Sequence, residues 1–226
     1  MKRQLPNLFT LCNLLCGCMA IIFILQPQIV LNQDQQAFML NSRFIFAPVW
    51  ILAAAVIDFF DGFLARALKS SSELGAQLDS LSDVVSFGVA PSMILYRLLE
   101  FSFFSRADAI NISILSILPA FLIALAAAWR LAVFNLDKSQ SQVFRGVPTP
   151  MTGLVVASLP LILWYNQLGA LWLLNPWVLY VIVILLSGMM ISRFPMMSLK
   201  GKDRKLSSYP PQIILAVSSV VLIIFF

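Results

Sequence analysis

Residues 58–83 decide the fold of this chain, and they read DFFDGFLARALKSSSELGAQLDSLSD. The stretch holds four aspartates, Asp58, Asp61, Asp79 and Asp83, beside a long apolar run in a chain that is 60% hydrophobic. Carboxylates are costly at a membrane boundary, so a cluster of four needs a compensating partner. Because hard divalent cations take carboxylate oxygens as ligands, the cluster predicts a metal site.

The spacing of the aspartates predicts a helical hairpin. Asp58 and Asp61 are three residues apart and Asp79 and Asp83 are four apart, so each pair shares one face of a helix. Residues 69–73 between the pairs form a polar turn. Two antiparallel helices would then bring both pairs together at one membrane surface.

The residues between the two pairs support this hairpin. Ser70 and Glu73 fit a capping box, which starts the second helix just before Gly75. Gly62, Ala65 and Gly75 leave little side chain on the facing surfaces, which permits close helix approach or a flat ligand against the backbone.

Composition places the chain among polytopic membrane proteins. It has 226 residues, of which 11% are charged, and its mean hydropathy is +0.91. No cleavable signal peptide is evident, because the first apolar stretch lacks a small-residue cleavage site. We expect an all-α membrane bundle forming a single domain over residues 1–226, with six core transmembrane helices and a short seventh at the C-terminus. The expected spans are 8–25, 45–68, 79–99, 112–135, 150–167, 171–192 and 210–226.

Basic residues orient this predicted bundle. With a cytoplasmic N-terminus, that side receives eleven of them: Lys2, Arg3, Arg66, Lys69, Lys138, Arg145, Arg193, Lys200, Lys202, Arg204 and Lys205. The other side receives Arg43, Arg97 and Arg106. This asymmetry follows the positive-inside rule and puts the aspartates at the cytoplasmic face.

Several function classes are disfavoured. The chain has no histidine, which leaves carboxylates as the strong candidates for a catalytic base. Cys12, Cys16 and Cys18 lie together in the first span and are interpreted as small buried residues. Nucleic acid is not an expected partner, since the basic residues flank the spans without interleaved aromatic residues. A metal-ion transporter would need acids along a pathway through the membrane, and residues 150–226 carry none within a span.

Polar residues inside apolar stretches are further candidates. Arg130 could bind an acceptor carboxylate or a lipid phosphate, or it could extend toward the cytoplasmic surface. Asn7, Thr10 and Asn13 share one face of the first span and could serve substrate binding or simple interfacial capping.

The pattern D-G-x2-A-R-x8-G-x3-D-x3-D, matched from Asp61 to Asp83, resembles the signature of the CDP-alcohol phosphatidyltransferases, with Asp58 as the preceding aspartate. The resemblance implies two divalent ions, Mg²⁺ or Mn²⁺, held by the four aspartates, with Asp83 also removing the proton of the attacking alcohol. It further implies a homodimer and assigns nucleotide binding to Gly62, Ala65 and Arg66. Gly75 of the signature, with Asn7 and Thr10 of the first span, completes the candidates for nucleotide or substrate binding.

Four flanking segments are similar to the bacterial phosphatidylserine synthases within this family: residues 6–17, 128–135, 144–150 and 189–200. This similarity implies CDP-diacylglycerol and L-serine as substrates, membrane lipids as surroundings, and a bacterial inner membrane with the site facing the cytoplasm. Glycerol 3-phosphate or inositol phosphate is the alternative acceptor. These anionic acceptors would want several basic residues near the aspartates, and the cytoplasmic loops offer few, chiefly Lys138 and Arg145.

Overall fold

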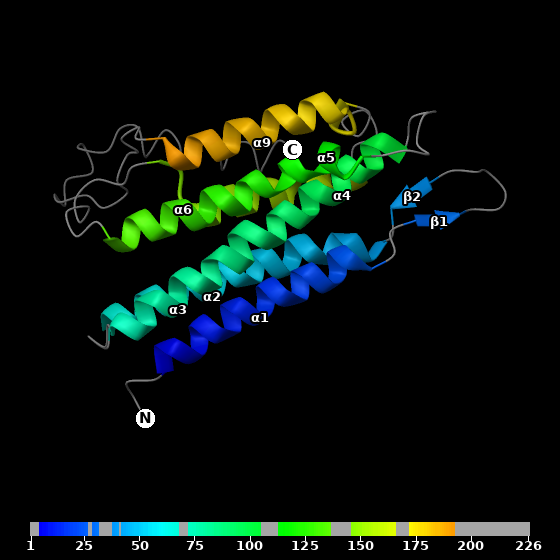
Figure 1. Ribbon diagram of the computed structural model, residues 1–226. Helices are drawn as coiled ribbons and strands as arrows, with labels where there is room; N and C mark the ends of the chain where they lie inside the picture. The colour runs from blue at the N-terminus through cyan, green and yellow to red at the C-terminus, as the bar shows by residue number, and fades with distance from the viewer. Residues whose placement is uncertain are drawn as a thin grey trace, which may run out of the picture.

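The computed structural model describes residues 5–26, 29–31, 38–40, 42–67, 72–104, 113–136, 146–165 and 172–192. Most of them form helices that run side by side along a common direction, with α1 and α9 on opposite sides of the bundle (Figure 1). The main helices are α1 (Leu5–Leu25), α2 (Phe46–Ala67), α3 (Glu73–Asp83), α4 (Ala90–Phe104), α6 (Leu122–Leu136), α7 (Thr149–Tyr165) and α9 (Pro176–Ile191).

Four helical stretches are long and apolar enough to cross a membrane: Asn7–Leu25, Arg43–Leu64, Glu73–Phe103 and Ile114–Leu136. The helices α7 and α9 are apolar but shorter, with 17 and 16 residues. At 1.5 Å per residue they reach about 25 Å, a little less than the roughly 30 Å of a bilayer core. All six occur where the sequence predicts apolar spans, although a count of six crossings is not established by length. The predicted segment 210–226 lies outside the described residues.

Short irregular elements join the long ones. A 3-10 turn, η2 (Ser42–Ile45), leads into α2, and α5 (Ile114–Ile117) with the 3-10 turn η5 (Leu118–Phe121) leads into α6. The connector after α1 contains a feature that the sequence did not predict. Strands β1 (Ile29–Leu31) and β2 (Phe38–Leu40) pair antiparallel, with Val30 opposite Met39. The bundle itself is all helical, and this ribbon lies at the end away from the N-terminus (Figure 1).

The helices α3 and α4 form one continuous rod through a π-helical turn, η3 (Val84–Val89). Ala90 N–H accordingly bonds to the carbonyl of Val85, five residues earlier. A π turn rotates the residues that follow it relative to those before it. Asp83 lies just before the turn, at the end of α3. Phe87 lies within the turn and is fully buried in the core.

Glycines allow the π turn to pack tightly against its neighbours. A Cβ on Gly17 of α1 would lie 2.8 Å from the Cα of Ser86. A Cβ on Gly153 of α7 would lie 3.1 Å from the Cβ of Phe87. Small residues at such positions let helix backbones approach closely within a membrane. The segment that follows the catalytic candidates is thus fixed between α1 and α7.

Candidate active site

Three of the four predicted aspartates converge. Asp58 of α2 and Asp79 and Asp83 of α3 each place a carboxylate oxygen within 4.8 Å of the others. Asp83 is 7% exposed, and the other two are half-buried. Among the described residues, no lysine or arginine forms an ion pair with any of them. A compact group of acids without a cationic partner is a suitable site for a divalent cation.

Asp61 is the fourth aspartate, and it has a different environment. Its carboxylate is buried and accepts a hydrogen bond from the Thr10 hydroxyl of α1. Its charge still acts electrostatically on Asp58 and Asp79, which lie nearby. Asp61 is therefore next to the three-carboxylate group rather than within it, and its role as a metal ligand stays a prediction.

The helix α1 supplies the groups that hold the aspartates in place. Thr10 and Asn13 are 3% and 1% exposed, so the polar face predicted from the sequence points into the protein. The Asn13 amide donates to Asp83 over 3.2 Å, just as the Thr10 hydroxyl donates to Asp61. Interfacial capping, the alternative reading of this polar face, does not describe these two residues.

Two serines fix the aspartate helix against α1. The Ser82 hydroxyl donates to the Thr10 carbonyl over 2.9 Å, and the Ser86 hydroxyl donates to the Asn13 carbonyl over 3.0 Å. These hydroxyls bond the backbone of the same residues whose side chains contact the aspartates. The registry between α1 and the rod of α3 and η3 is therefore set directly at the site.

The start of α3 differs in detail from the prediction. The helix begins at Glu73, as expected just before Gly75, but its cap is Ser72, whose hydroxyl accepts from the Gly75 N–H over 3.0 Å. Ser70 lies outside the described residues. A Cβ on Gly75 would meet the amide oxygen of Asn7 at 3.1 Å. Asn7 and Gly75, both predicted as binding residues, are therefore neighbours.

The remaining nucleotide candidates lie on α2. Gly62 is exposed on this helix, one residue after Asp61. Ala65 and Arg66 belong to its last turn, and their side chains are outside the described part of the structure. Their place in the helix puts them at the same end of the bundle as Asp58 and Gly75.

Arg130 of α6 points toward the aspartates rather than to the surface. Its guanidinium donates to the Thr149 hydroxyl over 2.9 Å and attracts Asp83 electrostatically. The two groups are too far apart to form an ion pair. Its Nε is buried and has no hydrogen-bond partner among the described residues. A fixed arginine with an unused donor beside a carboxylate group is suited to bind an anion.

A tight turn that requires glycine positions Thr149 against Arg130. Gly146 has a φ of 73°, and a Cβ there would lie 2.6 Å from the Met190 carbonyl. The next residue, Val147, donates its N–H to the Met189 carbonyl over 3.2 Å. Only glycine fits this approach without strain. The turn ties the start of α7 to the end of α9 and so brings Thr149 beside Arg130.

Several contact residues were not identified from the sequence. Thr149 was not singled out, although it lies between two prolines at a helix start. Ser82 and Ser86 are four residues apart, a spacing that places them on one helix face. Ser80 exchanges hydrogen bonds with Asn135 at 2.9 and 3.3 Å, which joins α3 to α6. Such spacing could have suggested a shared face, but it does not identify the partner helix.

Known proteins are similar to this chain in sequence. The family model of the CDP-alcohol phosphatidyltransferases matches residues 3–188, which include every site residue described above. A CDP-diacylglycerol–serine O-phosphatidyltransferase of Bacillus subtilis is 31% identical over 157 residues, or 70% of this chain and 75% of that protein.

Two further relatives carry the same description. The one from Methanocaldococcus jannaschii is 32% identical over 186 residues, which cover 82% of this chain and 73% of the relative. The one from Mycobacterium leprae is 32% identical over 199 residues, 85% of this chain and 57% of the relative, so the chain spans little more than half of that protein. With aspartates, signature and family match in agreement, the chain belongs to the CDP-alcohol phosphatidyltransferase family of transferases.

Proposed function

We propose that this chain transfers the phosphatidyl group of CDP-diacylglycerol to L-serine, giving phosphatidylserine and CMP. The observation that carries the proposal is the group of three carboxylates within 4.8 Å, beside an arginine with an unused donor. The names of the relatives, all CDP-diacylglycerol–serine O-phosphatidyltransferases, support serine as the acceptor.

The carboxylates fit the divalent ions that the family resemblance implies. Asp58, Asp79 and Asp83 offer only oxygen ligands and have no ion-pair partner among the described residues. We propose that they hold two ions, Mg²⁺ or Mn²⁺. Asp61 would be the fourth ligand and would keep its hydrogen bond with Thr10. Bound there, divalent ions would neutralise negative charge on the pyrophosphate of the donor.

Asp83 is our candidate for the base. It is the most buried of the three converging carboxylates, and the Asn13 amide fixes one of its oxygens. The serine hydroxyl would lose its proton to Asp83 as its oxygen bonds to the phosphorus that bears diacylglycerol. The bond from that phosphorus to the bridging oxygen breaks, and CMP leaves with the electron pair. A positioned base of this kind contributes about 10²- to 10⁴-fold.

The residues at the opening of the site would hold the nucleotide. Gly62 and Gly75 leave backbone accessible to a flat ligand, and the Asn7 amide lies beside Gly75. Ala65 and Arg66 complete this part of the family signature, with Arg66 available to pair with a phosphate. Arg130, which attracts Asp83 electrostatically, would bind the serine carboxylate or the lipid phosphate.

The membrane arrangement is also part of the proposal. Residues 1–226 would form one domain that crosses the bacterial inner membrane six times, with 210–226 as a further short span. The cytoplasm would face the aspartate end of the bundle, the end to which the positive-inside rule assigns most basic residues. The family resemblance also suggests a homodimer.

Release of CMP from CDP-diacylglycerol tests the reaction. Purified protein would be assayed with Mg²⁺ or Mn²⁺ and a panel of acceptors: L-serine, glycerol 3-phosphate, inositol phosphate and buffer alone. We expect release that depends on serine and a product that migrates as phosphatidylserine. If the protein prefers glycerol 3-phosphate or inositol phosphate, that compound and not serine is the acceptor. Release from none of the acceptors would reject the proposed reaction.

A further inference from the structure

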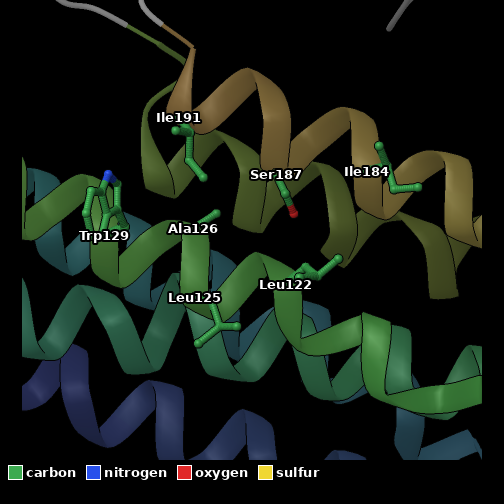
Figure 2. A pocket seen from close by; sticks show the side chains of 7 residues that line it. All are labelled: Leu122, Leu125, Ala126, Trp129, Ile184, Ser187 and Ile191. Carbon is green, nitrogen blue, oxygen red and sulfur yellow. The ribbon is translucent and has the colours of Figure 1, made fainter. Parts of the chain in front are cut away.

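An apolar groove runs along the outside of the bundle between α6 and α9, with a volume of about 400 Å³. Its floor is formed by Ala126 and Ser187, which are 2% and 8% exposed. Its walls include Trp129 at one end and Leu122 with Ile184 at the other (Figure 2). The walls are exposed on the surface of the bundle, so the groove opens sideways to the surrounding lipid.

Ser187 is an unusual residue for this floor. Its hydroxyl is buried, points from α9 toward α6 (Figure 2), and has no hydrogen-bond partner among the described residues. A serine elsewhere in the bundle bonds its own helix backbone: Ser158 of α7 donates to the Val155 carbonyl over 2.7 Å. A buried hydroxyl that makes no hydrogen bond is destabilising. Ser187 therefore indicates a ligand that carries a hydrogen-bond acceptor.

The groove reaches Trp129, next to Arg130 in α6, and its floor at Ala126 lies about one helical turn from Arg130. Ala126 precedes Arg130 by four residues on α6, a rise of about 6 Å. Arg130 has an unused donor in its guanidinium, whereas the groove beyond Ala126 is apolar. From the site inward, the order is thus a cation, a hydroxyl and an apolar channel. A diacyl lipid presents the matching order of phosphate, ester carbonyl and hydrocarbon chain.

We propose that this groove holds one acyl chain of the lipid donor, and that the Ser187 hydroxyl donates a hydrogen bond to the ester carbonyl of that chain. The inference rests on the proposed function, because it takes CDP-diacylglycerol as the donor. A second copy of the chain fits the groove less well. The other lining side chains are aliphatic or, in Trp129, carry an N–H that only donates, so the same face of a second copy offers Ser187 no carbonyl side chain. An ester carbonyl is free to accept.

The first test compares ester and ether donors. CMP release would be measured with CDP-diacylglycerol and with a CDP-dialkylglycerol of equal chain length, at saturating serine. Wild type should favour the ester in kcat/KM by roughly three- to tenfold, the effect of one hydrogen bond. Ser187→Ala should raise KM for the ester to that of the ether and leave kcat and the ether reaction unchanged. Ser158→Ala is the matched control and should keep the wild-type preference.

Two results of this comparison would overturn the assignment of Ser187. The first is an ester preference that Ser187→Ala leaves intact. The second is an equal loss with both donors, which would indicate a purely structural role.

The second test needs neither turnover nor a variant. A CDP-diacylglycerol with a diazirine midway along one acyl chain would be irradiated with wild-type protein, and labelled peptides would be mapped. We expect labels on α6 and α9 near Leu122 and Ile184, with competition by unlabelled CDP-diacylglycerol but not by phosphatidylglycerol. Three outcomes would reject the groove as the acyl-chain site. They are labels confined to other helices, labelling that unlabelled donor does not reduce, and exclusion of the probe by a second copy of the chain bound in the groove. Competed labelling in a protein that releases no CMP would reject the proposed reaction and keep the groove.

Discussion

The two ends of α1 both contact charged side chains from other helices, but they treat them differently. Near its N-terminus, Thr10 and Asn13 donate to Asp61 and Asp83, beside carboxylates that form no ion pair among the described residues. At its C-terminus, Arg97 of α4 donates to the carbonyls of Ile24 and Leu25 at 3.2 Å each.

The charge at the C-terminal end is balanced within the protein. Arg97 pairs with Glu100 at 2.6 Å, and its positive charge also suits the negative end of the α1 dipole. The charge at the N-terminal end forms no ion pair with any described side chain, and Arg130 attracts Asp83 only from beyond ion-pair distance. A protein buries charge at a membrane boundary only with compensation. The difference therefore separates a structural contact at one end from a ligand site at the other.

Removing divalent ions should have the largest effect, because it takes away the proposed compensation. We expect chelation by EDTA to reduce CMP release to background, with recovery on adding Mg²⁺ or Mn²⁺. Binding should also be visible without catalysis, since a ligand that binds the folded state raises its stability. The melting temperature of the wild-type protein should rise with Mg²⁺. That of the double variant, which carries both Asp58→Asn and Asp79→Asn, should not rise. Full activity after exhaustive chelation would contradict the metal site.

Asp83→Asn should have the next largest effect. The amide keeps the shape of the side chain but cannot accept the hydroxyl proton, so turnover should fall about 10²- to 10⁴-fold. Binding of CDP-diacylglycerol, measured separately, should be largely retained. Asp79→Asn is the comparison, and it should weaken donor binding. If Asp83→Asn loses donor binding and Asp79→Asn keeps it, the roles of the two residues must be exchanged.

Arg130→Ala should have an intermediate effect. Loss of a charge-assisted hydrogen bond to a buried partner costs about 1.5–3 kcal/mol, which corresponds to roughly 10- to 150-fold in kcat/KM. The measurement is CMP release over titrations of serine and of CDP-diacylglycerol, which shows which substrate the arginine binds. Thr149→Val is a useful companion, because it removes the hydroxyl that positions the guanidinium while keeping the charge. Unchanged kinetics for both substrates in Arg130→Ala would leave the arginine without a substrate role.

The helices could be predicted well from the sequence because apolar runs leave few alternatives in a membrane. The predicted span 150–167 corresponds to α7 (Thr149–Tyr165), and 45–68 corresponds closely to α2. The family and the convergence of Asp58, Asp79 and Asp83 also followed from motif spacing. Length limits the match, since α7 and α9 are shorter than a full span.

Partner choice could not be predicted in the same way. Spacing places Thr10 and Asn13 on one face of α1, but it does not say that this face meets α2 and α3. The π turn after Asp83 also cannot be predicted from the pattern of apolar residues. It depends on which carbonyl accepts the hydrogen bond of the Ala90 N–H. The separate position of Asp61 follows from its bond with Thr10, a contact 51 residues apart in sequence. The partners of α1 and the bond of Asp61 are tertiary contacts, which local periodicity does not encode, and the π turn is a local change of hydrogen bonding that the apolar pattern does not show.

Arg97→Ala should have the smallest effect on activity, because its contacts are complete without a ligand. The variant loses two bonds to the end of α1 and the pair with Glu100, all of them partly exposed. We expect a loss of about 1 kcal/mol in stability, or roughly 2–4 °C in melting temperature, with CMP release per folded molecule near wild type. Glu100→Gln is the matched control and should lower the melting temperature less, since Arg97 keeps its carbonyl bonds. A large loss of turnover in Arg97→Ala with an unchanged melting temperature would mean that the two ends of α1 are functionally coupled, and the division between a structural end and a ligand end would be wrong.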